Sequence, residues 1–142
     1  MTSKIDHVTR LMAIAEGCFL SMPPSMARAS ILDIATTYNG IGPSWAPQWL
    51  RDALSGWLSL FQPAALIHDY HYSMIDPKTD WAEDEREIAD WEFFQNCRKL
   101  TAIEYPIWNV TCWPLRAAHE YQAFCAWRAV RRLGGFSIGG DR

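Results

Sequence analysis

The sequence has no long apolar run and none of the features that make up a signal peptide. No stretch approaches the roughly 18 consecutive apolar residues that a transmembrane helix needs. The first residues also lack the charged start, apolar run and small-residue cleavage site that a signal peptide combines. We therefore expect a protein made in the cytoplasm, with no signal peptide and no transmembrane segment.

Closely spaced cysteines and an excess of basic charge are missing as well. The four cysteines are far apart and form no CxxC pair (Cys18, Cys97, Cys112 and Cys125). This spacing argues against a zinc site and against a dense disulfide scaffold. The formal net charge of −3 argues against nucleic-acid binding, which needs a basic field. Three arginines near the end of the chain are interpreted as a solvated helix terminus (Arg128, Arg131 and Arg132).

What the sequence does have is helical periodicity, which proline and glycine break into blocks. Apolar residues recur at helical spacing through the blocks, and no convincing period-two alternation predicts a strand. We expect helices over about 5–20, from a Ser25 cap to near Asn39-Gly40, from Pro47 to about 61, from Pro63 to about 75, from a Thr79 or Asp80 cap to about Leu100, and from Pro114 to Gly134-Gly135.

These blocks predict an all-α fold. We expect a single small helical domain over residues 1–135, with its core motif in 38–100, and a flexible tail over 136–142. The helix that begins at Pro63 is apolar on several sides, which is typical of a buried central helix. A short connection joins it to the next long helix, so the two should pack as central antiparallel helices. A glycine-bearing loop, 38–43, precedes them.

The most apolar part of the chain, AALIHDYHYS at residues 64–73, contains the adjacent ionisable residues His68 and Asp69. An unpaired buried charge costs several kcal/mol, so each residue needs a partner. Successive residues of a helix point about 100° apart, so these two side chains face different directions. Tyr72, four residues on, shares the side of His68.

Asp90 is the expected partner of His68. It precedes Phe93 and Phe94 on an apolar stripe of the following helix. A histidine held by a buried carboxylate is a general base whose tautomer and orientation are fixed, and Tyr72 can donate a hydrogen bond to the same aspartate. The alternative interpretation is a buried polar network that only fixes helix packing.

Asp69 should face the glycine loop. Gly40 and Gly42 can turn carbonyl groups inward because glycine tolerates positive φ. Carbonyl oxygens and one carboxylate form a hard oxygen site, which suits Ca²⁺. The sequence therefore predicts calcium held by Asp69 with carbonyls at Asn39, Gly40 and Gly42, beside a histidine that activates water. The alternative is an Asp69 that lies on the helix surface or caps a helix.

The block from Ser44 to Phe61 is rich in tryptophan. Trp45, Trp49 and Trp57 are candidates for contact with a phospholipid membrane surface, where indole rings prefer the headgroup region. The alternative is a helix packed over the core.

Taken in order, the loop 38–43, the pair His68-Asp69, Tyr72 and Asp90 resemble the phospholipase A₂ superfamily. That family has a glycine-rich calcium loop, an HD pair on a central helix, a tyrosine four residues after the histidine, and an aspartate on the antiparallel partner helix. The likeness is closest to the short, disulfide-free viral form, in which two alanines precede HD and aromatic residues follow Ala-Asp. The resemblance implies a calcium-dependent hydrolase of phospholipid acyl esters, with His68, Tyr72 and Asp90 as its catalytic residues.

A second resemblance covers more of the chain, about Tyr38 to Gly135. The segments NGIGPSW, AALIHDYHY, ADWEFF and AWRAVRRLGG are similar to an uncharacterised phage-associated family with an HDYLY-like core and a terminal VR-x-x-G. This likeness implies a bacteriophage or prophage origin, and hence synthesis in a bacterial host. Two functions stay open: a phage hydrolase, and a non-catalytic structural or interaction protein that binds other virion proteins. An inhibitor of a host enzyme is a third option, which no residue favours.

Overall fold

The computed structural model describes residues 2–40 and 46–139, and side chains over 4–40 and 46–133. Within these ranges the chain is helical and contains no strand, so the expected all-α class is confirmed there. The elements are α1 (Thr2–Gly17), η1 (Met26–Arg28), α2 (Ile31–Thr37), α3 (Gln48–Trp57), η2 (Ser59–Phe61), α4 (Gln62–Ser73), α5 (Ala82–Glu104), η3 (Val110–Cys112) and α6 (Trp113–Gly139), where η denotes a short 3₁₀ helix.

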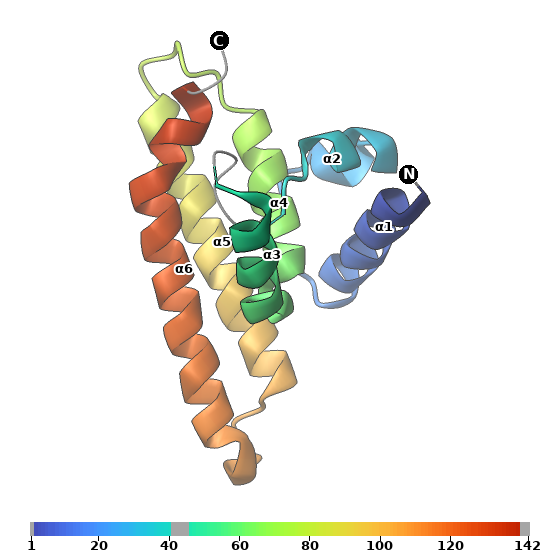
Figure 1. Cartoon of the computed structure of the whole chain (residues 1–142), viewed down its shortest axis with the longest axis vertical. Helices are drawn as coiled ribbons and strands as arrows, with labels where there is room; N and C mark the ends of the chain where they lie inside the picture. The colour runs from blue at the N-terminus through green and yellow to red at the C-terminus, as the bar shows by residue number, and fades with distance from the viewer. Residues whose placement is uncertain (1, 41–45, 140–142) are drawn as a thin grey trace.

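Three helices form the body of the molecule (Figure 1). Helix α5 packs against both α4 and α6 and runs antiparallel to each of them. Helices α1 and α2 pack on α4, on the side away from α6. The side-chain amide of Gln62, at the start of α4, donates to the backbone oxygen of Ser55 and so ties α3 to the bundle. The expected antiparallel packing of the two central helices is therefore found.

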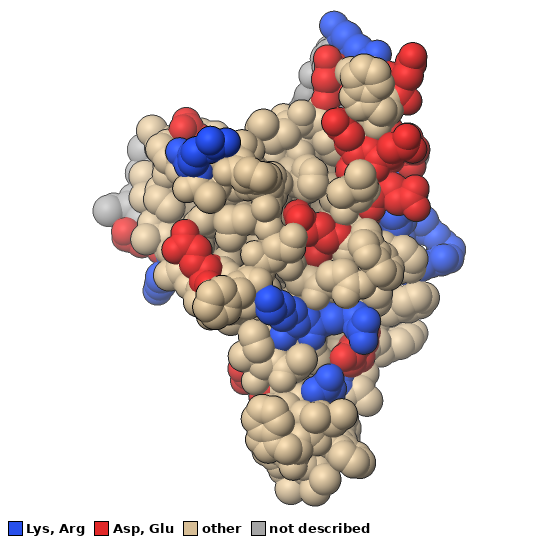
Figure 2. Space-filling model, turned by 180° about the vertical axis from the view of Figure 1, so that it is seen from behind, with Lys and Arg blue, Asp and Glu red and all other residues tan. Residues whose placement is uncertain are grey.

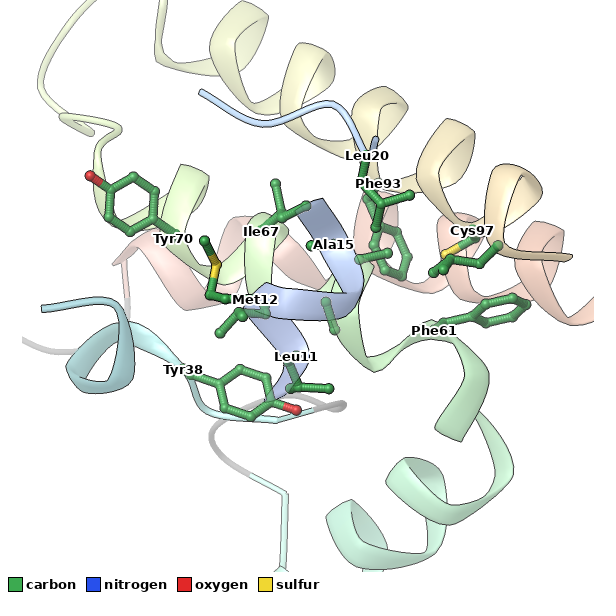
Figure 3. Close-up of a cluster of buried hydrophobic side chains, with 14 of the residues drawn as sticks. Leu11, Met12, Ala15, Leu20, Tyr38, Phe61, Ile67, Tyr70, Phe93 and Cys97 are labelled. Carbon is green, nitrogen blue, oxygen red and sulfur yellow. The ribbon is translucent and has the colours of Figure 1, made fainter. Parts of the chain in front are cut away.

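Helix α4 is the centre of the hydrophobic core (Figure 3). Seven of its twelve residues are buried, including Leu66 and Ile67. Phe61, just before the helix, is fully buried next to the α5 side chains. Each of these large side chains contributes about 1.5–3 kcal/mol by leaving water. The prediction of a buried central helix beginning at Pro63 is confirmed, and Pro63 lies in its first turn.

The second predicted helix begins later than expected. Ser25 lies in helical conformation and makes no capping hydrogen bond. Ser30 instead caps α2, because its Oγ accepts the backbone N–H of Asp33 at 3.1 Å and donates to the Asp33 carboxylate at 2.6 Å. The bond from the Asp33 N–H satisfies one of the free N–H groups of the helix start. The Ser25 prediction is therefore wrong, and the S-x-x-D spacing marks the true start.

Two other helix ends differ from prediction. Helix α5 begins at Ala82 without a side-chain cap, so neither Thr79 nor Asp80 caps it. Those residues belong to a turn in which the Thr79 N–H donates to the carbonyl of Asp76. Helix α6 continues to Gly139, past the glycines at 134–135; a glycine lowers helix stability by only about 1 kcal/mol. A flexible tail over 136–142 remains a prediction, and residues 140–142 lie outside the described part.

Candidate functional site

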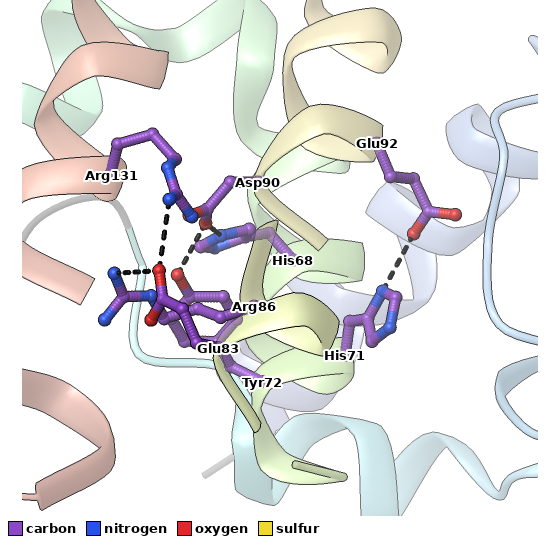
Figure 4. Close-up of polar contacts among 8 residues, drawn as sticks. All are labelled: His68, His71, Tyr72, Glu83, Arg86, Asp90, Glu92 and Arg131. Atoms are coloured by element: carbon purple, nitrogen blue, oxygen red, sulfur yellow. Dashed lines mark hydrogen bonds and ion pairs between the residues drawn. The ribbon is translucent and has the colours of Figure 1, made fainter. Parts of the chain in front are cut away.

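His68 on α4 and Asp90 on α5 meet between the two helices, as predicted (Figure 4). The distance from His68 Nε2 to Asp90 Oδ1 is 2.8 Å. The Asp90 side chain is fully buried, and 8% of the His68 side chain is exposed. The other ring nitrogen of His68, Nδ1, forms no hydrogen bond to any residue that the structure describes. The imidazole is thus held at one nitrogen and has the second available.

Tyr72 joins the pair from the same helix as His68. Its hydroxyl donates a hydrogen bond to Asp90 Oδ1, and its ring lies against the imidazole with 4.2 Å between ring centroids. Phe93 covers another side of the imidazole, with centroids 5.0 Å apart. Burial and the bond to Asp90 raise the pKa of Tyr72, so the phenol stays protonated and acts as a donor. The predicted placement of Tyr72 is confirmed.

Arg131 on α6 is a third partner of Asp90, and the sequence analysis missed it. Its guanidinium donates to Asp90 Oδ2 at 3.0 Å and to Glu83 Oε1 at 3.1 Å. The interpretation of Arg131 as part of a solvated helix terminus is therefore wrong. The sequence does hold a signal: Phe124, Trp127 and Arg131 follow helical spacing, and both aromatic residues pack in the cluster that joins α6 to α5. That stripe turns Arg131 toward the bundle.

These contacts fix the charge of Asp90. Burial alone would raise the pKa of its carboxyl group, but the hydrogen bonds from His68, Tyr72 and Arg131 outweigh burial and lower it. Asp90 is therefore an anion near neutral pH. A buried carboxylate that remains ionised can orient an imidazole and stabilise its protonated form.

Asp69 faces away from this cluster and toward the loop after α2, as expected. Its Oδ2 accepts the backbone N–H of Asn39 at 2.9 Å. Gly40 follows with a φ of 82°, a left-handed conformation that glycine adopts without strain. Burial raises the pKa of Asp69 to about 6, and burial together with the Asp69 charge raises the pKa of Tyr38 to about 12. Asp69 therefore holds the loop against α4.

Of the side chains in the predicted calcium site, the described residues supply one carboxylate, that of Asp69. Asp69 forms no ion pair with a described basic side chain, and its Oδ1 accepts no hydrogen bond from the described residues. A partly buried carboxylate with a raised pKa gains stability from a bound cation. No cluster of three or more metal-ligating side chains occurs in the described ranges, so carbonyl oxygens must supply the remaining ligands. Gly42, one of the predicted ligands, lies outside the described residues.

Two further polar residues of α4 and α5 serve packing. His71 Nδ1 lies 3.2 Å from Glu92 Oε1, on the other side of α4 from the His68 cluster (Figure 4). The buried amide of Asn96 accepts the N–H of Ser21 at 2.9 Å and donates to its carbonyl at 2.8 Å. These contacts fix the segment after α1 on α5. The sequence analysis missed Asn96, which carries no distinguishing pattern.

The tryptophans of α3 lie on the surface. Trp49 and Trp57 are both more than half exposed, and α3 contains no buried residue. Leu54 of the same helix packs against the core, so α3 does lie over the core, with these two tryptophans exposed. Trp45 lies outside the described residues. Over the described ranges, no helix combines the length and apolarity needed to cross a bilayer.

Comparison of the chain with protein-family models, curated proteins and solved structures finds no match.

Proposed function

We propose that the protein is a calcium-dependent phospholipid acyl-ester hydrolase of the phospholipase A₂ type. The observation that carries the proposal is the fixed imidazole of His68, whose Nε2 is bound to the buried carboxylate of Asp90 at 2.8 Å. A histidine held in this way is suited to take a proton from water with its other nitrogen. The resemblance of the HD pair, Tyr72 and Asp90 to that superfamily supports the same chemistry.

In this reaction His68 Nδ1 takes a proton from a water molecule while the water oxygen attacks the ester carbonyl. Asp90 stabilises the imidazolium that forms, since its carboxylate stays ionised. Tyr72 keeps the carboxylate in place through its hydroxyl. The tetrahedral species then expels the alcohol oxygen, which receives the proton from His68 Nδ1. The products are a free fatty acid and a lysophospholipid, and one water molecule is consumed.

Asp69 would hold Ca²⁺ together with carbonyls at Asn39, Gly40 and Gly42. The ion, when bound, polarises the ester carbonyl and offsets negative charge on its oxygen. Because one carboxylate is a small ligand charge for calcium, we expect binding in the millimolar range. Trp49 and Trp57 would contact the phospholipid surface from α3. Trp45, which lies outside the described residues, is the third predicted contact. A phage would use such an activity at a host membrane, during genome entry or lysis.

The first experiment is hydrolysis of fluorescent phospholipid vesicles by the purified protein, with millimolar Ca²⁺ or with a chelator. The proposal expects fatty-acid release that the chelator stops and that Asp69→Ala reduces strongly. A matched control is Asp33→Ala, which changes an exposed carboxylate of α2 that accepts a hydrogen bond from the Ser30 hydroxyl. Release that is equal with and without calcium would contradict the calcium role.

The second candidate is a non-catalytic structural or interaction protein of the virion, and one observation favours it. Asp90 receives hydrogen bonds from His68, Tyr72 and Arg131, so a single buried carboxylate links α4, α5 and α6. Such a network can serve helix registry alone. Calcium separates the two candidates: the enzyme should gain thermal stability in millimolar Ca²⁺ and lose that gain in Asp69→Ala, whereas a scaffold should not respond.

A further inference from the structure

The connection between α5 and α6, residues 105–115, exposes an unusual amount of apolar surface. We call these residues the hairpin tip. They contain no charged side chain, and Trp108 is 83% exposed. Ile107, Val110 and Trp113 are also more than half exposed. The hairpin tip forms the lower end of the molecule in Figure 1 and the tan lower end in Figure 2. An exposed patch of this kind marks an interaction surface.

Several polar groups of the hairpin tip are paired within it. The N–H of Asn109 donates to the Pro106 carbonyl at 3.0 Å, and the N–H of Cys112 donates to the Asn109 carbonyl at 3.1 Å. The indole N–H of Trp113 donates to the Ile107 carbonyl at 2.8 Å. Backbone groups that are already paired can enter an apolar environment at low cost. The hairpin tip is therefore suited to lie in the boundary between lipid headgroups and acyl chains.

Basic side chains lie directly above the hairpin tip. Arg98, Lys99 and Arg116 line a surface hollow of about 460 Å³, which we call the basic hollow. Glu120, the only acidic residue among those that line it, pairs with Arg98 at 3.3 Å and with Arg116 at 3.9 Å. Lys99 Nζ donates to the Phe19 carbonyl, so three basic side chains face one carboxylate and the hollow keeps a net positive charge. Figure 2 shows a band of Lys and Arg atoms immediately above the tan end. Lys99 precedes the end of α5 by five residues, which is about 8 Å along the helix.

Phe19 lies at the rim of the basic hollow in a strained conformation. It is 81% exposed, and its φ of 53° is in the left-handed region. Its N–H donates to the Glu16 carbonyl, and the N–H of Leu20 donates to the Ala15 carbonyl, so α1 ends in a Schellman motif. Glycine normally occupies the left-handed position of this motif. Backbone strain at an exposed residue often persists because the side chain has a function, which indicates a functional role for Phe19.

We propose that the hairpin tip and the basic hollow together form a docking surface for anionic phospholipid bilayers. Trp108, Ile107 and Trp113 enter the headgroup boundary, to the depth of about 5–10 Å that interfacial side chains reach. Arg98, Lys99 and Arg116 then lie at the level of the lipid phosphates and attract them. Phe19 adds apolar contact at the rim. Amphipathic tryptophan below a belt of basic residues is the pattern that the membrane interface favours.

This docking surface is separate from the proposed catalytic cluster. Arg131 lies 18 residues after Trp113 on α6, which is about 27 Å along the helix. The proposal therefore stands whether or not the protein hydrolyses lipid. A tip-to-tip pair of two copies is disfavoured by charge, because it would bring together two basic hollows that each keep a net positive charge.

The test is co-sedimentation with vesicles of phosphatidylcholine alone or mixed with phosphatidylglycerol, in the His68→Gln variant and with a chelator, so that hydrolysis plays no part. We expect binding to the mixed vesicles that falls with added salt. Ile107→Ser/Trp108→Ser should abolish it, and Arg98→Gln/Lys99→Gln should weaken it roughly tenfold to thirtyfold. Phe19→Gly should weaken binding while the protein stays folded.

The matched control is Trp81→Ser/Ile88→Ser, which removes two exposed apolar side chains at the other end of α5 from the hairpin tip. Retained binding in this control, with loss in Ile107→Ser/Trp108→Ser, supports the proposal. Undiminished binding in the tip variant would overturn it, as would an absence of binding by the protein without tip substitutions. A dimer in solution that Ile107→Ser/Trp108→Ser converts to a monomer, without vesicle binding, would assign the surface to a second copy instead.

Discussion

Arg131 on α6 donates a hydrogen bond at 3.0 Å to Oδ2 of Asp90 on α5, although the two residues are 41 positions apart in the chain. His68 and Tyr72 occupy the other oxygen of the same carboxylate. Three helices therefore converge on one buried anion. This arrangement gives Asp90 the charge that an imidazole-orienting residue needs, and it also makes Asp90 important for stability.

Arg131→Gln should destabilise the protein by about 1–3 kcal/mol, because a buried carboxylate loses a charged donor. The pKa of Asp90 is lower in the folded protein than in the unfolded chain. The ionised carboxylate therefore stabilises the fold at pH values above the unfolded pKa, and this stability is lost as the pH falls through the pKa of the folded state. The variant should therefore lose stability at a higher pH than the unsubstituted protein. Urea denaturation between pH 7 and pH 3 measures this. Arg132→Gln, at an exposed neighbouring position, is the control and should change little.

Tyr72→Phe removes one hydrogen bond to Asp90 and keeps the ring that packs on His68. We expect a loss of about 1 kcal/mol in the free energy of unfolding. Vesicle hydrolysis should fall only modestly, since His68 and Arg131 still hold the carboxylate. A complete loss of hydrolysis in a folded Tyr72→Phe variant would show that the tyrosine has a direct role in the reaction.

Asp69→Asn should stabilise the protein at pH 7 when calcium is absent. The folded pKa of Asp69, about 6, lies above the ordinary value of 3.8, so the charged carboxylate opposes folding at neutral pH. The unsubstituted protein regains this stability as pH falls from 7 toward 4, and the difference between the two proteins should shrink over that window. Denaturant unfolding at several pH values measures it. In millimolar Ca²⁺ at pH 7 the unsubstituted protein should become more stable than Asp69→Asn. If Asp69→Asn stays the more stable of the two, this would argue against Asp69 as a ligand.

Phe19→Gly should raise the free energy of unfolding by about 1 kcal/mol, because glycine adopts the left-handed conformation of residue 19 without strain. Thermal unfolding of the two proteins is the measurement. A stabilised variant that binds vesicles less well would show that the phenylalanine is kept for the surface it offers. A destabilised variant would mean instead that the Phe19 side chain contributes to packing.

Much of the central architecture could be predicted from local pattern. The apolar run around residues 64–73 predicts a buried helix. The position of Asp90 on an apolar stripe indicates a buried carboxylate. The meeting of His68 with Asp90 then follows from the short connection between two antiparallel helices. The same reasoning places Asp69 toward the loop at Asn39, because adjacent helical residues point apart.

The contacts that could not be predicted depend on long-range packing. Arg131 contacts Asp90 only because α6 lies along α5. The cluster of three arginines near the end of the chain is equally consistent with a solvated helix terminus. Asn96 holds the backbone of Ser21 from 75 positions away, which no local spacing indicates. Ser25 and Ser30 are both good caps by residue type, and the Asp33 carboxylate decides between them.

The most direct test of the central claim is the rate of fatty-acid release from phospholipid vesicles by His68→Gln, compared with His71→Gln on the same helix. We predict that His68→Gln stays folded but loses at least about a hundredfold in rate, as expected for removal of a general base, and that His71→Gln remains active. Equal release by His68→Gln and the unsubstituted protein, or no release by the unsubstituted protein with calcium present, would contradict a catalytic role for the histidine.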